Sequence, residues 1–407
     1  FNSDGVDIGE IAQDLLIEGN RIWNCFDKGI SIGQASTAII RHNLIMHVDM
    51  GLGIKDRGSY GLIENNTFHK LSHAVSVYEK NLGDGGGEAL VRNCIVSHAT
   101  VSPFFCDSLS TITVSYCISD TDAVPGASNL TDEVLFLNAS ATNFHLQVGS
   151  PAVDSGDPSS DPDPDGSRAD MGAFAFDWRE GHAVISEIHY HPADSNRAEF
   201  IELNNPGGAP LDLGGYCFSR GLDYVFPSGA ILAPGAYLVV AAGTNVPGAT
   251  NVLVWTVGIL DNAGETIQLI DPQSNEIDRV AYGVEAPWPA APNGLGPSLA
   301  LIDPRWNNSL PASWYASEAT GGTPDGPFDN QLPGNLVIDR VAGGGIRLSA
   351  DGLPGLLYLI EYSPTLLPPN WSPVGTAGSA MDGLVQIDQT PASGNTQGFY
   401  RVRAYAP

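Results

Sequence analysis

Basic residues near the start of this 407-residue chain are the first candidates for chemistry. The chain has four lysines, which all lie early in the sequence, as Lys28, Lys55, Lys70 and Lys80. Lys55, Arg57 and Lys80 come at or just after the ends of short runs in which apolar and polar residues alternate, whereas Lys28 and His73 begin such runs. If the runs are stacked strands, Lys55, Arg57 and Lys80 should form one exposed basic ridge.

A basic ridge of this kind is suited to an acidic sugar. A cation neutralises the carboxylate of a uronate and acidifies its C5 proton, which a Lys, Arg or His can then remove. Neighbouring cations lower the pKa of a lysine and so help it to act as the base. Lys55, Arg57 and Lys80 are therefore the candidate catalytic residues, and Lys28 and His73 join them as candidate ligand-binding residues.

The same residues also permit an interpretation without chemistry. Three lysines adjoin an acid, in the pairs Lys28 with Asp27, Lys55 with Asp56 and Lys80 with Glu79. Exposed ion pairs contribute only about 0–1 kcal/mol each and imply no reaction. A flat, ion-paired wall would favour this interpretation, whereas a groove with a base within reach of a sugar would favour catalysis.

An acidic segment further along is a candidate metal site. Asp161, Asp163 and Asp165 alternate with prolines and precede a glycine, as in the first half of a Ca²⁺-binding loop. The bidentate Glu that would complete the loop is missing, so Asp170 would have to supply the fourth carboxylate. We expect weak Ca²⁺ binding by these four residues, and the alternative is a solvated acidic turn.

The elements that must position the basic residues repeat with a period of about 23 residues. An Asn followed two positions later by an apolar residue recurs as Asn20/Ile22, Asn43/Ile45, Asn66/Phe68 and Asn93/Ile95, and a fifth copy has Tyr116/Ile118. Stacked Asn side chains can bond from coil to coil as a ladder. A fixed period of this size, with no helix needed between copies, predicts a right-handed parallel β-helix over residues 1–176.

The alternating runs predict the interior of that β-helix. Two columns of aliphatic residues would point inward, namely Val6, Ile30, Leu52 and Val75, and then Ile8, Ile32, Ile54 and Val77. The residues between them would point outward, because successive side chains of a strand face opposite sides. An ordinary β-sandwich with coincidental spacing is the alternative.

Two further β-rich segments follow. Short strands divided by Gly and Pro turns predict a β-sandwich over residues 183–326 and a small β-sandwich over 336–407. The whole chain is therefore predicted to be all-β and multidomain.

Several motifs resemble known families. The runs "DKGISIG" (27–33) and "GLGIKDRGS" (51–59) make the first segment resemble the pectin-lyase-like β-helix superfamily. That superfamily includes polysaccharide lyases, hydrolases and epimerases as well as non-catalytic surface proteins. The resemblance therefore implies an architecture and leaves the reaction open.

The middle segment resembles the bacterial lamin-tail domain, which is an immunoglobulin-like sandwich. The runs "ISEIHYHP", "EFIELNNPG", "LDLGGY", "FPSGAILAPGAYLVV", "DRVAYG" and "GPSLALIDP" carry the likeness. It implies an accessory or adhesion module without catalytic residues. The last segment, with "YLIEYS" and "FYRV", resembles C-terminal β-domains of secreted proteins from some environmental bacteria.

Composition narrows the classes of partner. The formal net charge of −28 repels nucleic acid backbones and anionic lipids, so neither is an expected partner. No run of apolar residues is long enough to span a membrane. We expect a monomer. Five cysteines without paired spacing argue against a disulfide scaffold or a zinc site, although Cys94 and Cys117 lie 23 positions apart and could pair.

These observations leave three functional hypotheses open. The first is a secreted or cell-surface bacterial protein whose β-helix contacts an acidic polysaccharide or cell-surface glycan, with the sandwiches as anchors or spacers. The second is a lyase that acts on a uronate glycan, and the third is a purely structural surface protein. Residues 1–5 have the pattern of mid-coil residues, so we expect further coils and a targeting signal upstream.

Overall fold

The computed structural model describes residues 4–328, 334–341, 345–353, 356–365, 372–379, 384–389 and 399–404. These residues form β-strands and two short 3-10 helices, η1 (Ala139–Ala141) and η2 (Pro311–Ser313), so the predicted all-β class is confirmed. No helix in the described part of the chain is long and apolar enough to cross a membrane.

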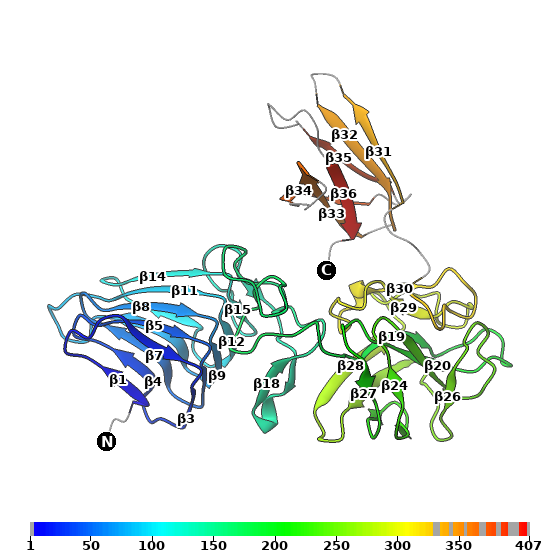
Figure 1. The fold of residues 1–407 in the computed structure, drawn as a ribbon, viewed down its shortest axis with the longest axis horizontal. Helices are drawn as coiled ribbons and strands as arrows, with labels where there is room; N and C mark the ends of the chain where they lie inside the picture. Colours follow the sequence, from blue (N-terminus) through cyan, green and yellow to red (C-terminus); the bar gives the residue numbers. More distant parts are fainter. Residues whose placement is uncertain are drawn as a thin grey trace.

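The N-terminal part winds as a parallel β-helix in which successive turns add strands to three sheets (Figure 1). Sheet A consists of β1 (Val6–Ile8), β4 (Lys28–Ile32), β7 (Met50–Lys55), β10 (His73–Tyr78) and β13 (Phe104–Cys106). Sheet B consists of β2 (Leu15–Glu18), β5 (Thr37–Arg41), β8 (Tyr60–Glu64), β11 (Glu88–Arg92) and β14 (Thr111–Ser115). Sheet C consists of β3 (Arg21–Trp23), β6 (Leu44–Met46), β9 (Thr67–Leu71), β12 (Ile95–Ala99), β15 (Ile118–Ser119) and β16 (Leu130–Thr131). The predicted right-handed parallel β-helix is confirmed.

The predicted aliphatic columns fill its interior. Ile30 pairs with Val6 and Leu52, and Leu52 pairs with Val75, in the register expected from the sequence. The second column has the same register, and its central members Ile32 and Ile54 are wholly buried. Burial of one such side chain contributes about 1.5–3 kcal/mol, so the stacked columns are a main source of stability.

An asparagine ladder runs through the corner before sheet C. The Asn20 side chain donates to Asn43 Oδ1 at 2.9 Å, and the Asn43 side chain donates to Asn66 Oδ1 at 2.9 Å. Asn43 and Asn66 are wholly buried. Their amides therefore satisfy backbone groups of neighbouring coils that water cannot reach.

Asn93 and Tyr116 do not continue the ladder, so the repeat register predicted for these two coils is wrong by one residue. Ile95 pairs with Thr67 and with Ile118, which places Cys94 and Cys117 on the next rungs. Both cysteines are buried free thiols. Asn93 and Tyr116 instead occupy the preceding corner position, where the backbone is left-handed, with φ of 53° and 50°.

The segment after the last coil folds back over the β-helix. A hairpin of β17 (Phe136–Asn138) and β18 (Asn143–Leu146) packs Phe144 against Leu44 and Met46. Further on, Ala173 donates its backbone N–H to Thr67 Oγ1 at 2.9 Å. Residues 150–176 therefore lie against coils that are about 100 positions earlier in the sequence, as the bond between Ala173 and Thr67 shows.

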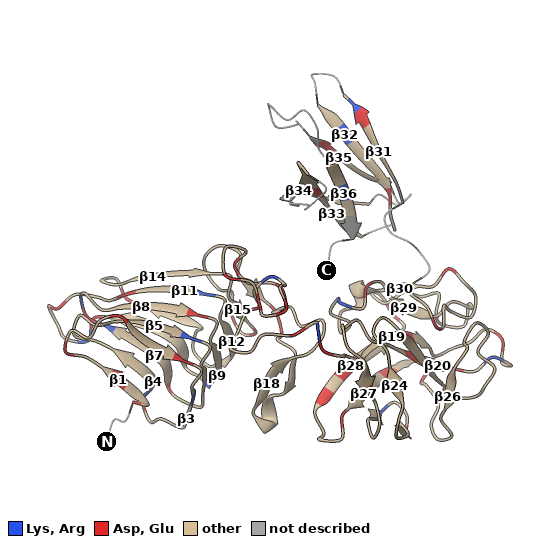
Figure 2. Ribbon diagram, viewed as in Figure 1, with Lys and Arg blue, Asp and Glu red and all other residues tan. Residues whose placement is uncertain are grey.

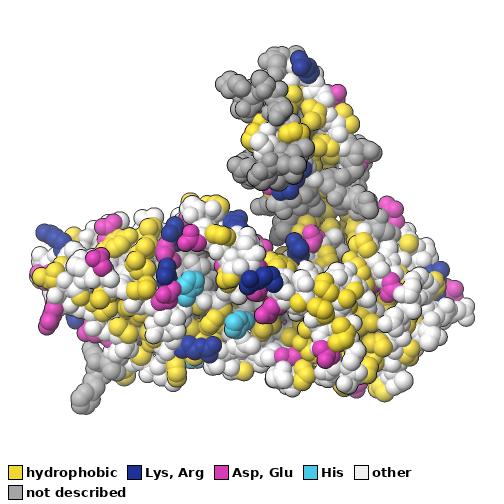
Figure 3. All heavy atoms as spheres, in the orientation of Figure 1, with side chains coloured by type: hydrophobic (Ala, Val, Ile, Leu, Met, Phe, Trp, Pro, Cys, Tyr) yellow, Lys and Arg dark blue, Asp and Glu magenta, His cyan; other side chains and the backbone are white. Residues whose placement is uncertain are grey.

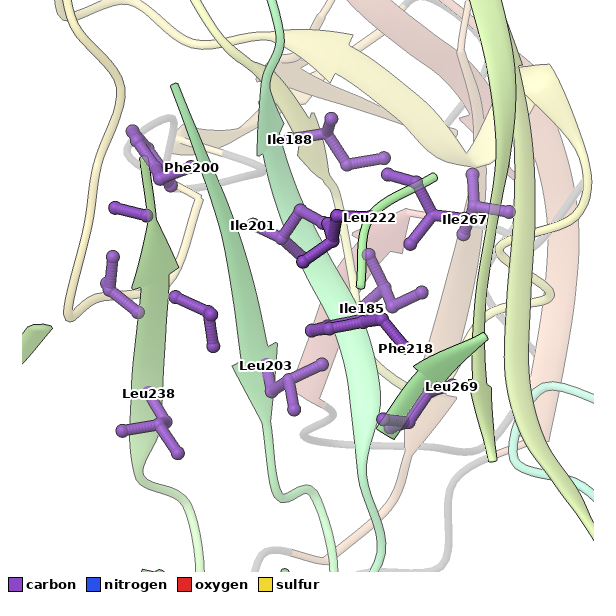
Figure 4. Close-up of a cluster of buried hydrophobic side chains, with 14 of the residues drawn as sticks. Ile185, Ile188, Phe200, Ile201, Leu203, Phe218, Leu222, Leu238, Ile267 and Leu269 are labelled. Carbon is purple, nitrogen blue, oxygen red and sulfur yellow. The ribbon is translucent and has the colours of Figure 1, made fainter. Parts of the chain in front are cut away.

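The middle part is a β-sandwich. One sheet has the order β26 (Val252–Val254), β25 (Tyr237–Ala241), β20 (Phe200–Asn204), β19 (Val184–His189), β29 (Leu299–Leu301) and β30 (Trp314–Ala316). The other has β23 (Tyr224–Val225), β22 (Cys217–Arg220), β27 (Gly264–Ile270) and β28 (Glu276–Gly283), and β21 (Leu211–Asp212) pairs with β24 (Ile231–Leu232). Side chains from both sheets, including Ile188, Ile201 and Ile267, meet in a buried core (Figure 4).

The C-terminal part has two three-stranded sheets. One holds β31 (Gly334–Arg340), β32 (Ile346–Asp351) and β35 (Leu384–Gln389), and the other holds β34 (Ser372–Gly378), β33 (Leu357–Ser363) and β36 (Phe399–Ala404). Leu348, Tyr358 and Ile360 form its buried centre. Parts of the predicted range 336–407 lie outside the described residues.

Candidate ligand-binding face of sheet A

Glycines shape the outer face of sheet A where the predicted basic residues lie. A Cβ atom on Gly53 would stand 2.8 Å from Lys28 Cδ, and one on Gly33 would stand 3.3 Å from Lys55 Cε. The two lysine side chains therefore lie across positions that any larger residue would fill. This arrangement holds both lysines flat against the sheet.

Lys55 is buried, with 6% of its surface exposed, so the prediction of an exposed ridge is wrong for this residue. Its Nζ donates to Ser31 Oγ and lies 3.7 Å from Asp7 Oδ1. Burial lowers the pKa of Lys55, and the charges of Lys80 and Lys28 lower it further, whereas Asp7 raises it. Lys55 thus has the depressed pKa that was expected of a base.

Lys28 is also buried but is tied to acids. Its Nζ donates to Asp27 Oδ2 and lies 3.9 Å from Asp4 Oδ1. Burial is the largest influence and lowers its pKa, but Asp27, Tyr78 and Asp4 together raise the pKa of Lys28 above the ordinary value. Lys28 is therefore a fixed cation, and the pair that it forms with Asp27 matches the interpretation without chemistry.

The other two sequence-neighbour pairs do not form. Asp56 accepts the backbone N–H groups of Lys80 at 2.6 Å and of Asn81 at 3.0 Å. Glu79 accepts the backbone N–H group of Gly85 at 2.7 Å. These carboxylates hold the turns after the strands of sheet A. The Lys80 side chain is exposed and makes no ion pair with any residue that the structure describes.

Arg57 lies apart from the two lysines of the sheet. Its side chain is exposed, and its guanidinium approaches the glycine-rich insert, where a Cβ on Gly85 would stand 3.0 Å from Arg57 Nε. The structure therefore brings Lys55 and Lys80 together, and it places Arg57 along the insert.

A hollow of about 530 Å³ opens over Lys55, and we call it the lysine hollow. Its lining consists of Asp7, Ile8, Gly9, Glu10, Gly33, Gln34, Lys55, Asp56, Lys80 and Asn81. A site with a desolvated cation, Lys55, in its lining is suited to a ligand that carries a carboxylate.

A second hollow of about 410 Å³ lies further along the same face, and we call it the aromatic hollow. Its lining consists of Met50, His73, Ser76, Tyr78, Glu79, Phe105 and Asp107. Phe105 is 44% exposed, and its ring centroid lies 5.7 Å from that of His73. Ser76 Oγ is buried and has no hydrogen-bond partner among the described residues. A ligand hydroxyl could satisfy this atom.

The sequence pattern pointed to His73 as a site residue, but it did not point to Tyr78, Ser76 or Phe105. Ser76 and Tyr78 stand at outward positions of a strand that the alternation had located. Phe105 lies on β13, which pairs with β10 by placing Phe105 opposite Ser76. The aromatic pair Phe104–Phe105 was the available signal, since one of two adjacent strand residues must face outward.

The four predicted metal ligands do not all converge, although the carboxylates of Asp163 and Asp170 interact. Asp163 accepts the backbone N–H of Asp170 at 2.8 Å, and Asp170 Oδ2 accepts that of Phe176 at 2.5 Å. Asp165 accepts the backbone N–H of Trp178 at 2.8 Å, and Asp161 is exposed. Within the described residues no group of three or more His, Cys, Asp or Glu is placed to hold a metal ion. The arrangement is a hydrogen-bonded acidic turn, and Ca²⁺ binding stays a prediction.

Thermal melting tests that prediction. Burial raises the pKa of Asp163 to about 6 and that of Asp170 to about 8. Because folding raises both pKa values, their contribution to stability is lost as pH rises from about 4 towards 8. If Ca²⁺ neutralises the turn, millimolar Ca²⁺ should raise the melting temperature at pH 8 more than at pH 5. Equal melting temperatures in chelator and in Ca²⁺ at pH 8 would show that this segment is an acidic turn that does not bind Ca²⁺.

Comparison with known proteins supports the two larger domains. The family model described as the right handed beta helix region matches residues 2–82, which include Lys28, Lys55 and Lys80. The family model of the Lamin Tail Domain matches residues 179–284. No curated protein matches the chain. The chain is thus a modular β-rich protein, and the matches leave the narrower pectin-lyase-like likeness as a suggestion.

Proposed function

We propose that this is a secreted modular surface protein whose β-helix binds an acidic polysaccharide along the outer face of sheet A. The lamin-tail and C-terminal β-domains would serve as adhesion modules or spacers. The observation that carries the proposal is the pair of hollows on this one face, with the buried cation Lys55 at the floor of the first and the exposed ring of Phe105 in the second.

The geometry of the sheet supports an elongated ligand. Neighbouring strands lie about 4.8 Å apart, which is close to the length of one sugar unit in a chain. A polysaccharide that runs across the strands can therefore place successive units over β7, β10 and β13. A carboxylate can approach Lys55 and Lys80, while the apolar face of another unit rests on Phe105.

Charge removal provides the test. In the variant Lys55→Ala/Arg57→Ala/Lys80→Ala we expect binding of a polyuronate, measured by calorimetry at low salt, to weaken roughly 30-fold, or about 2 kcal/mol, because charge-assisted contacts are lost. Wild-type affinity should also fall as salt rises. The control variant Arg179→Ala/Arg220→Ala/Arg279→Ala removes the same charge from the middle sandwich and the turn just before it, and should bind normally. No binding by the wild type to any acidic glycan at low salt would contradict the proposal.

A lyase is the second candidate, and the lowered pKa of Lys55 favours it. Neutral Lys55 would take the C5 proton of a uronate, the C4–O bond would break, and the leaving oxygen would be protonated as the C4–C5 double bond forms. The unsaturated product absorbs ultraviolet light. If the glycan binds but no ultraviolet absorbance appears, the outer face of sheet A recognises the glycan without cleaving it. If neither binding nor absorbance is seen, a purely structural surface protein is favoured.

A further inference from the structure

The outer face of sheet B is apolar along its middle, unlike the outer face of sheet A. Leu16, Ile39, Leu62 and Leu90 stand on four successive strands in one outward-facing column. Leu16 is 53% exposed and Ile39 is 39% exposed, while Leu62 and Leu90 are partly buried. We call this column the aliphatic stripe, and Figure 3 shows hydrophobic side chains gathered on this side of the β-helix. Contiguous apolar surface of this kind commonly marks an interaction site.

Charged residues of alternating sign form the next outward column. Glu18, Arg41, Glu64 and Arg92 follow one another along the β-helix, and we call them the charge column. Arg41 Nε lies 2.8 Å from Glu18 Oε1, and Arg92 Nη2 lies 2.5 Å from Glu64 Oε1. In Figure 2 the colours alternate at the ends of β5, β8 and β11. An apolar stripe with a polar border is the composition expected of an interface.

We propose that the outer face of sheet B is an interface on which a second copy of this chain docks. The two copies are related by a two-fold axis that runs parallel to the strands and passes between β5 and β8. This axis reverses the direction of the β-helix while it keeps each column opposite itself. Two-fold pairs in which the same patch meets itself are the commonest assemblies of soluble proteins.

The order of charges selects a second copy as the occupant. Reversing the charge column exchanges acid for base at each of its four rungs, so Glu18 faces the Arg92 of the other copy and Arg41 faces its Glu64. Within its own chain Arg92 Nη1 also lies 3.3 Å from Asp157 Oδ2. In the aliphatic stripe the same operation sets Leu16 against Leu90 and Ile39 against Leu62. A face that is complementary to its own reversed image has no need of another kind of partner.

The other border of the aliphatic stripe carries acidic residues that would repel each other between the two copies. A third outward column contains one residue from each successive coil, in the order Asp14, Thr37, Tyr60 and Glu88. Thr37 lies beside Asp14, Tyr60 pairs with Thr37 on the adjacent strand, and Glu88 pairs with Tyr60. The two-fold axis places the exposed acids Asp14 and Glu88 opposite each other. This contact is repulsive and limits the affinity, so the copies are expected to form a dimer that depends on concentration. Such pairing departs from the monomer that the sequence led us to expect.

Sedimentation velocity on the whole chain tests the interface. We expect the sedimentation coefficient to rise over roughly two decades of concentration in the micromolar range. The variant Leu16→Glu/Ile39→Glu should weaken association at least about tenfold, because it buries charge in the interface. The control Val257→Glu/Ile259→Glu changes two exposed apolar residues of the middle sandwich, which are 58% and 76% exposed, and should dimerise as the wild type does. Circular dichroism verifies the fold of both variants.

Two charge reversals test the orientation. Arg41→Glu and Glu64→Arg should each weaken self-association, because each sets like charges opposite one another, and a mixture of the two variants should recover it. Glu88→Lys should strengthen association, because it replaces a repulsion with an attraction to Asp14. A wild-type chain that stays monomeric throughout, or a mixture that behaves as the separate variants do, would overturn the proposal.

Discussion

Replacement of Asn66 by Ala is expected to lower the free energy of unfolding of the β-helix by about 3–5 kcal/mol, since each buried group that loses its partner costs about 1–3 kcal/mol. Asn66 Oδ1 accepts the backbone N–H of Asn43 at 3.0 Å and its side-chain amide at 2.9 Å. Asn66 Nδ2 donates to Ile40 O at 2.8 Å and to Glu64 O at 2.9 Å. The substitution removes all four bonds in a place that water does not reach.

Urea unfolding followed by hydrogen-exchange mass spectrometry of β6 and β9 measures this loss for the β-helix alone, which matters in a chain of several domains. The matched control is Asn20→Ala at the exposed end of the same ladder. The Asn20 backbone N–H still donates to Asn43 Oδ1 at 3.0 Å, so we expect a loss below about 1 kcal/mol. Equal losses at the two positions would show that burial of the ladder is not what stabilises it.

The sequence determined the β-helix because its signal is repetitive. One apolar column predicted from residues such as Ile30 and Leu52 is supported by every other coil, so a local error does not change the fold. The register after Asn66 was less secure. A glycine-rich insert and the replacement of Asn by Cys94 removed the marker for that rung, and the neighbouring Asn93 imitated it.

The candidate site was predictable in its residue types but not in its burial. The alternation places Lys55 in an outward position, which ordinarily means exposure. Its burial depends on Gly33 of the adjacent coil, over which the side chain lies down. The acidic turn was likewise predictable in its residue types but not in its contacts. The carboxylates of Asp163 and Asp165 accept hydrogen bonds from backbone N–H groups, and the spacing of the acids in the sequence does not reveal these bonds.

Asp278 is a buried carboxylate where the two sheets of the middle sandwich meet. Asp278 Oδ2 accepts the backbone N–H of Ile185 at 2.6 Å and the side-chain amide of Asn308 at 2.8 Å, which links β28 to β19 and to the segment before β30. Burial is the largest influence and raises the pKa of Asp278 to about 7. The folded protein therefore retains a proton there at pH values where the unfolded chain, with a pKa near 3.9, has lost it.

Stability that depends on this proton is complete below about pH 4 and is lost as pH rises towards 7, because a raised carboxyl pKa favours folding only at low pH. We expect Asp278 to contribute a fall of about 2–4 kcal/mol in the free energy of unfolding of the sandwich between pH 4 and pH 8, measured as the difference between the wild-type and Asp278→Asn profiles, since each unit of pKa shift corresponds to about 1.4 kcal/mol. Asp278→Asn mimics the protonated acid and should remove most of this decline, whereas Asp278→Ala should destabilise the sandwich at both pH values because Ile185 and Asn308 lose their acceptor. Urea titrations followed by tryptophan fluorescence report on this domain through Trp255 and Trp314, which are buried in its core. A wild-type stability that is constant or rises over the same pH interval, when Asp278→Asn shows the identical profile, would mean that Asp278 is ionised in the folded protein.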